Sequence, residues 1–146
     1  MKTKLAFLCL VTLLFLGSCV QQKRNPLEGA WQIISGEIYS GDTLQTMMKT
    51  AENATEIKMF TKTYYSFIGQ IKSDTTTLDL YGVGTYTLDG THCEEIISTN
   101  GIQAVEGSGT KMLVEIKNDT MIQKWPCDDN WEIGSDYYIQ RWVRLE

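Results

Sequence analysis

The sequence predicts an all-β protein, an eight-stranded antiparallel up-and-down barrel that follows an N-terminal export signal. Three observations support this fold class. Many short segments are rich in Ile, Val, Thr and Tyr and alternate apolar with polar residues. Two-residue turn signals separate neighbouring segments, and only one short stretch has helical spacing. Strands that follow one another in a meander can form a sandwich or a barrel, and the barrel is favoured because closure removes both sheet edges.

The expected strands share this alternating pattern and follow one another at short intervals. They lie at residues 30–40, 57–61, 64–70, 80–88, 91–98, 111–117, 120–125 and 137–144. The segment 42–55 breaks the alternation. There Leu44, Met47 and Met48 recur at helical spacing after Asp42 or Thr43, either of which can cap a helix, so the sequence predicts one short helix after the first strand.

Two turns allow the inward faces to be assigned. Asp89-Gly90 is a strong hairpin signal, and Asn118-Asp119 is a weaker one. Because a two-residue turn fixes register, residues on both sides of it can be placed on one face. The first inward face comprises Tyr86, Leu88, Thr91, Cys93, Glu95 and Ile97, and the second comprises Met112, Val114, Ile116, Met121, Gln123 and Trp125.

The N-terminus has the organisation of a signal peptide. Lys2 and Lys4 precede an apolar stretch at 5–16, which is too short to span a bilayer stably. Leu16-Gly17-Ser18-Cys19 resembles the lipobox of bacterial lipoproteins, which implies a lipid on the Cys19 thiol and cleavage just before it. An ordinary secretory signal that ends near a cysteine is the alternative.

The sequence therefore divides into three parts. These are a lipoprotein signal peptide at 1–18, a polar tether at 19–25 and one barrel domain at 26–146. In the bacterial lipoproteins that this leader resembles, an acidic run after the cysteine is typical of export to the cell surface. The tether here is basic, so the resemblance implies attachment to the outer membrane on the side that faces the periplasm.

Charge and motif content exclude several functional classes. The chain has 18 acidic and 13 basic residues and a formal net charge of −5, spread without long runs, which disfavours nucleic-acid binding. His92 is the single histidine and has no nucleophile evidently placed beside it, so we expect no enzymatic activity and no cofactor. A metal site at His92, Cys93 and Cys127 is disfavoured, because positions 92 and 93 point to opposite faces of a strand.

Cys93 and Cys127 remain after the leader is removed and Cys19 is lipidated. Outside the cytoplasm two such cysteines can form a disulfide, so a bridge between Cys93 and Cys127 is one of two open predictions. Two buried free thiols are the alternative.

A family resemblance supports the barrel. Gly29-Ala30-Trp31 resembles the Gly-x-Trp signature of lipocalins. The segments at 58–67 and 84–90, with the closing Trp142-Val143-Arg144, resemble the lipocalin-like proteins of Bacteroidetes. The resemblance implies that Trp31 packs at the closed end and that a basic residue lies across it, with Arg144 the best match and Arg141 the alternative.

The interior provides the candidate site. Tyr65, Phe67, Tyr86 and Trp125 either line a ligand cavity or fill the barrel completely. Glu95 shares their inward face, and a carboxylate inside a barrel must be paired, hydrated or protonated. The leading hypothesis is a membrane-tethered protein that binds a small apolar or amphipathic ligand, screened by residues 42–55. The alternative is an interaction or structural lipoprotein with a filled barrel.

Overall fold

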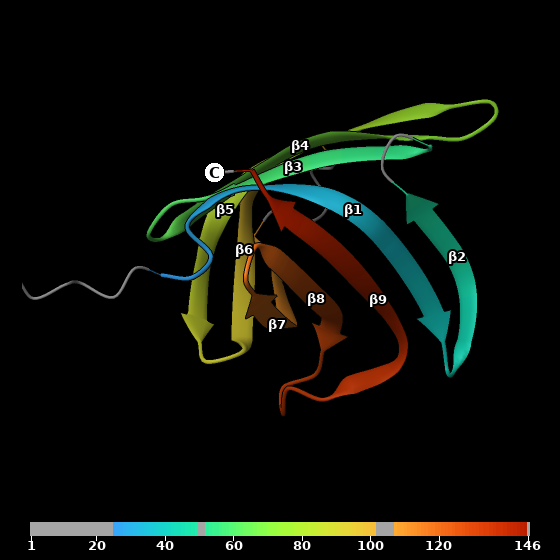
Figure 1. Ribbon diagram of the computed structural model, residues 1–146. Coiled ribbons are helices and arrows are strands. Elements are labelled where there is room, and N and C mark those ends of the chain that lie inside the picture. Colours follow the sequence, from blue (N-terminus) through green and yellow to red (C-terminus); the bar gives the residue numbers. More distant parts are fainter. Residues whose placement is uncertain (1–24, 50–51, 102–106, 146) are drawn as a thin grey trace, which may run out of the picture.

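The computed structural model describes residues 25–49, 52–101 and 107–145. It is an antiparallel β-structure whose strands curve around one lumen (Figure 1). The strands are β1 (Gly29–Ser40), β2 (Thr43–Lys49), β3 (Ala54–Phe60), β4 (Tyr64–Lys72), β5 (Thr77–Asp89), β6 (His92–Asn100), β7 (Gly109–Lys117), β8 (Thr120–Cys127) and β9 (Ile133–Arg144). β1 pairs with both β3 and β9, which closes an eight-stranded barrel and confirms the predicted architecture.

β1 changes partner along its length, and this opens the wall at one place. From Gly29 to Gln32 it pairs with β3, whereas from Ser35 to Ser40 it pairs with β2 on the same side. β9 follows β1 on the other side almost throughout. β1 and β3 therefore diverge after the Gln32–Ile57 pair, as Figure 1 shows, and β2 lies outside the closed barrel.

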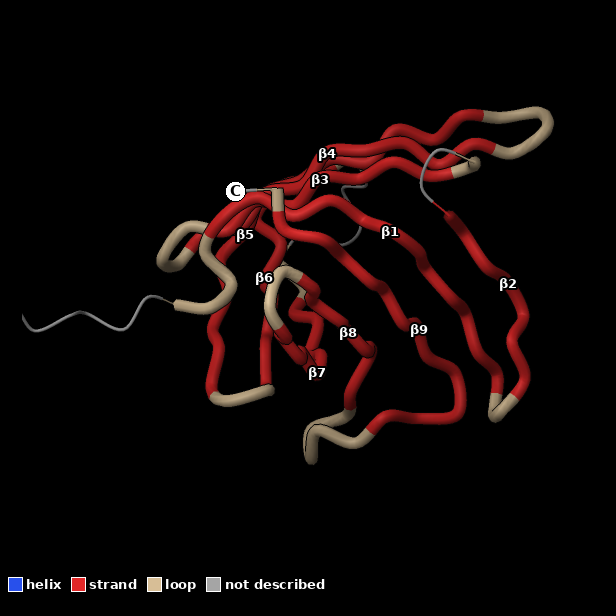
Figure 2. Tube along the Cα trace, in the orientation of Figure 1, coloured by secondary structure: helices blue, strands red, loops and turns tan. Residues whose placement is uncertain are grey.

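The short helix predicted after the first strand is wrong. The described part of that segment forms β2, a turn and the first two residues of β3, and Figure 2 shows only strands and loops among the described residues. Gly41, with a φ of 57°, makes a tight turn that brings Thr43 opposite Ser40. The edge of β1 that β3 leaves free then supplies backbone partners for β2, and this pairing outweighs a helical spacing of only three apolar residues.

The two marked hairpins form close to their predicted positions. Asn118-Asp119 is a two-residue turn in which Asn118 has a φ of 56°. The other turn lies one residue later than predicted, because Asp89 pairs with His92 and Gly90 has a φ of 60°. This change alters the cross-strand partners but keeps Tyr86, Leu88, Cys93, Glu95 and Ile97 on one face, as predicted. Thr91 is the exception, because it lies in the turn and is exposed.

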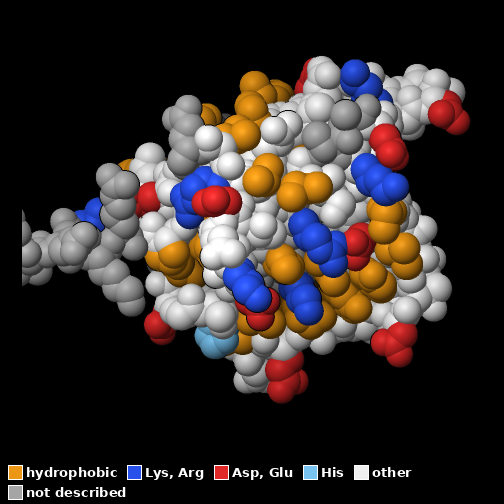
Figure 3. Space-filling view, in the orientation of Figure 1, with side chains coloured by type: hydrophobic (Ala, Val, Ile, Leu, Met, Phe, Trp, Pro, Cys, Tyr) orange, Lys and Arg blue, Asp and Glu red, His pale blue; other side chains and the backbone are white. Residues whose placement is uncertain are grey.

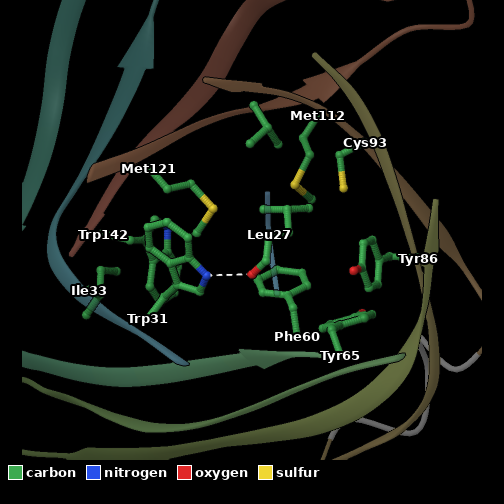
Figure 4. Close-up of a cluster of buried hydrophobic side chains, with 11 residues drawn as sticks. Leu27, Trp31, Ile33, Phe60, Tyr65, Tyr86, Cys93, Met112, Met121 and Trp142 are labelled. Carbon is green, nitrogen blue, oxygen red and sulfur yellow. Dashed lines mark hydrogen bonds between the residues drawn. The ribbon is translucent and has the colours of Figure 1, made fainter. Parts of the chain in front are cut away.

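One end of the barrel is filled by a packed core (Figure 4). Leu27 and Trp31 are fully buried there, and the indole Nε1 of Trp31 donates a hydrogen bond of 2.7 Å to the Leu27 carbonyl. The Arg144 guanidinium lies 4.0 Å from the centre of the Trp31 ring and donates to the carbonyls of Pro26 and Glu28. The expected arrangement of Trp31 and Arg144 is therefore present, and it closes this end.

The predicted disulfide is not formed, since Cys93 and Cys127 are both free thiols. Cys93 lies on β6 and Cys127 on β8, with β7 between them. Two strand spacings amount to about 9–10 Å, beyond the Cα separation that a disulfide can bridge. Cys93 instead packs in the core, where burial raises its pKa to about 12 and keeps the thiol protonated.

Candidate ligand-binding cavity

The other half of the barrel encloses a cavity of about 300 Å³. Most of its lining is apolar, and residues from all nine strands contribute to it. These lining residues include Phe67, Ile71, Leu80, Ile97, Met112 and Trp125. The ring of Trp125 stacks on that of Tyr138 at 4.2 Å, and its Nε1 donates to the Gln140 side chain at 3.1 Å, so one wall is a fixed aromatic surface.

The cavity extends to the place where β1 and β3 part. Ile33 of β1 and Met48 of β2 line it from one side, and Ala54 and Thr55 at the start of β3 line it from the other. The segment that was expected to screen the open end therefore contributes lining residues, as a strand and not as a helix.

A buried ion pair separates the cavity from the packed core. The Lys58 ammonium lies 3.1 and 3.2 Å from the two carboxylate oxygens of Glu95, and each side chain is only 7% exposed. The same ammonium lies 5.3 Å from the Trp142 ring and 5.6 Å from the Tyr65 ring. Because Lys58 and Glu95 also line the cavity, the pair forms its polar floor.

Glu56 is a second acidic group in the cavity, one inward position closer to the mouth than Lys58. Among the described residues, no ion-pair or hydrogen-bond partner contacts its carboxylate. Burial raises the pKa of Glu56, and the nearby Glu95 carboxylate raises it further, whereas Lys58 acts in the opposite direction. The proton is therefore retained to a higher pH than on an ordinary glutamate.

Four of the five residues predicted for the ligand site line this cavity. They are Tyr65, Phe67, Glu95 and Trp125. Glu95 is paired, which is one of the three states expected for an interior carboxylate, and its partner is Lys58.

Tyr86 does not belong to the cavity lining and is a correction to the predicted set. It lies in the filled end, where its hydroxyl donates 2.6 Å to the Thr61 carbonyl and accepts from the Asn25 amide at 2.8 Å. Strand alternation placed it inside correctly, but alternation does not give the depth of a residue along the barrel axis.

Lys58 and Glu56 were missed as site residues. The cross-strand pairs Lys58–Phe67 and Phe60–Tyr65 place them on the same face as the predicted aromatic residues. On β3 the usual pattern, with apolar residues inward and charged residues outward, is reversed. Ile57 and Met59 face outward and are exposed, whereas Glu56 and Lys58 face inward. The register of the 60–65 hairpin was the signal that could have identified them.

The remaining predicted features lie elsewhere or outside the description. Cys19 and the signal peptide are outside the described residues. His92 stacks on Trp131 at 4.4 Å and takes no part in the cavity. Within residues 25–49, 52–101 and 107–145, no group of three or more His, Cys, Asp and Glu side chains could hold a metal ion. The same ranges contain no helix that is long and apolar enough to span a membrane.

Comparisons with family models, curated proteins and solved structures give no match for this chain.

Proposed function

We propose that this protein is a lipid-anchored, lipocalin-like lipoprotein whose barrel holds a small apolar or amphipathic molecule. The observation that carries the proposal is the cavity of about 300 Å³ between Phe67, Leu80 and Trp125. This volume is at the lower end of the range for small-molecule pockets, and an apolar lining with a few polar groups is typical of them. The contact between Trp31 and Arg144 at the closed end supports the lipocalin-like assignment.

The binding proposal is tested with an apolar fluorescent probe, Nile red, and a matched pair of variants. Phe67 lines the cavity, whereas its neighbour Ile68 faces outward and is 61% exposed. Phe67→Glu should reduce Nile red affinity by about tenfold or more, because it places an unpaired charge in the apolar site. Ile68→Glu adds the same charge outside and should leave Nile red affinity unchanged. Both variants should keep the far-UV circular dichroism spectrum of the original chain. Equal effects of the two variants would contradict the proposed site.

The anchoring proposal rests on the lipobox-like sequence that ends at Cys19. Each buried methylene of an acyl chain contributes about 0.8 kcal/mol, and stable attachment needs more than one chain. Cys19→Ala should therefore move the protein from the membrane pellet to the soluble fraction of the envelope. A variant that stays in the pellet after a high-salt wash would show that another element is the anchor.

An interaction lipoprotein is the second candidate, and one surface feature favours it. On the outer face of β3, β4 and β5, the cross-strand row of Ile57, Ile68 and Tyr81 is exposed. Contiguous apolar surface of this kind often marks a contact site. If neither Nile red nor a lipid extract binds at micromolar concentration, this outer row becomes the proposed contact site of an interaction lipoprotein.

A further inference from the structure

The charged groups that line the cavity do not balance. Glu56 and Glu95 contribute two carboxylates, and Lys58 contributes one ammonium. β9 also carries two arginines close to its lining residues Tyr138 and Gln140, but neither arginine lines the cavity. Arg144 covers Trp31 at the closed end, and Arg141 is paired with Glu37. Among the described lining residues, the acidic groups are therefore in excess.

Lys58 is already committed and cannot serve a ligand carboxylate without loss. Both oxygens of Glu95 lie within 3.2 Å of its ammonium, and the rings of Trp142 and Tyr65 flank it. A ligand carboxylate that took Lys58 would leave Glu95 buried without its cation. Removing one partner from a buried ion pair is strongly unfavourable, so anionic amphiphiles are disfavoured at this floor.

Glu56 has the opposite property, since its acceptor oxygens have no partner among the described residues. Residues two apart on a strand are separated by about 6.5–7 Å, so Glu56 lies one such step above Lys58 on the wall of the cavity. A cationic head group at this depth would compensate the carboxylate. It would also lie in the same cavity as the stacked faces of Trp125 and Tyr138, which attract cations.

We infer that the cavity selects amphiphiles with a positively charged head group, such as alkylamines, over fatty-acid carboxylates of the same length, with Glu56 as the residue that determines the preference. This inference rests on the proposed binding function. The alkyl chain lies against Phe67 and the other apolar lining residues, and the ammonium group is near Glu56.

The selection is coupled to pH through the Glu56 carboxyl. The titratable groups that share the cavity with it are Lys58 on its own strand, Tyr65 on β4, Glu95 on β6 and Tyr138 on β9, and Lys58 and Glu95 act on its charge. Burial and Glu95 favour the protonated acid in the empty cavity, whereas a bound cation favours the carboxylate. Binding of an alkylamine therefore releases a proton from Glu56, and its affinity rises with pH until Glu56 is ionised in the free protein.

The test is displacement of Nile red by three ten-carbon amphiphiles, decylamine, decanol and decanoate, from the mature chain carrying Cys19→Ala. We expect decylamine to bind at least about tenfold more tightly than decanoate, with decanol between them. Glu56→Gln should remove most of this preference and the pH dependence between pH 5 and 8, and leave decanol affinity unchanged. Glu115→Gln, which removes an exposed outward carboxylate on β7, is the matched control and should change nothing.

The outcomes separate this inference from the function on which it rests. If Nile red and decanol bind but decanoate equals or exceeds decylamine, the charge selection is overturned and the apolar site stands. A preference that survives Glu56→Gln overturns the role of Glu56. If no apolar probe binds at all, both the inference and the proposed function fail.

Discussion

The two halves of the barrel are made by the same strands but have different interiors. At the closed end, Trp31, Trp142 and Leu27 are fully buried and fill the lumen. In the open half, Phe67 and Trp125 line a cavity. β3 contributes to both halves, with Phe60 in the core and Glu56 in the cavity. Alternation along a strand thus decides whether a residue faces the lumen, and its depth decides whether it packs or lines a site.

The ion pair of Lys58 and Glu95 marks the boundary between the halves. A buried pair is a weak source of net stability, because the cost of desolvating two charges offsets most of their attraction. Its position under the cavity, however, limits how far the packed core extends. The two side chains occupy the layer in which further apolar side chains would otherwise extend the core, so the open half keeps a polar floor.

The outer surface also differs between regions of the wall. Figure 3 shows hydrophobic side chains between Lys and Arg side chains over β1, β2 and β9. Leu44 and Met47 of β2 are exposed, because β2 lies beyond the closed barrel and pairs with β1 alone among the described strands. This region combines a free strand edge with apolar side chains, which distinguishes it from the fully paired part of the wall.

The largest expected effect tests whether the closed end carries the stability. Trp31→Ala should reduce the free energy of unfolding by about 3–5 kcal/mol, since it removes a fully buried indole and its contact with Arg144. Phe67→Ala in the open half should cost less, about 1–2 kcal/mol, because Phe67 already borders a cavity. Urea unfolding measures both, and equal losses would contradict the distinction between the halves.

The next effect addresses the boundary. Glu95→Leu leaves the Lys58 ammonium buried without its carboxylate and should destabilise the protein by about 3 kcal/mol, at the low end for a broken buried pair because the cavity can admit water. The double variant Lys58→Met with Glu95→Leu should recover to within about 1 kcal/mol of the original chain. Chemical unfolding of all three proteins decides it. A double variant as unstable as the single one would mean that the pair itself holds the two halves together.

Much of the fold could be predicted from the sequence because its signals are local. Turn residues such as Asn118 fix register, and alternation then fixes facing, so the eight barrel strands and the inward position of Glu95 followed. The predicted helix is wrong because β2 depends on β1 as its strand partner. The divergence of β1 from β3 provides the free edge on which Leu44 and Met47 become part of a strand.

The candidate site was only partly predictable, for a related reason. The depth of a residue along the barrel depends on how the strands are staggered. The sequence does not give this stagger, so Tyr86 was predicted in the ligand site although it lies in the filled end. Lys58 was missed because an inward lysine contradicts the usual apolar pattern unless its partner is known, and Glu95 is 37 residues away. Cys93 and Cys127 have suitable chemistry for a bridge, but strand order keeps them apart.

The smallest expected effect uses Tyr86 to sharpen the boundary of the closed end. Tyr86 is 5% exposed, and its hydroxyl is bonded to Thr61 and Asn25. Tyr86→Phe should therefore cost about 1 kcal/mol near pH 7, the usual value for lost hydrogen bonds, and should leave Nile red binding unchanged. If the variant lost probe affinity as Phe67→Glu does, Tyr86 would belong to the cavity after all.

The stability difference between Tyr86→Phe and the original chain should also depend on pH. Burial raises the pKa of Tyr86 to about 12, whereas a tyrosine in the unfolded chain ionises near 10. The folded state thus holds this proton when the unfolded state releases it, so the contribution of Tyr86 is complete below pH 10 and is lost as the pH rises toward 12. At pH 11 ionisation of Tyr86 should have lowered the free energy of unfolding of the original chain by about 1 kcal/mol. The original chain and Tyr86→Phe should then be about equally stable. Urea unfolding of both proteins from pH 8 to 11 measures the convergence, and parallel pH profiles would show that the Tyr86 hydroxyl is not held in a dry, closed end.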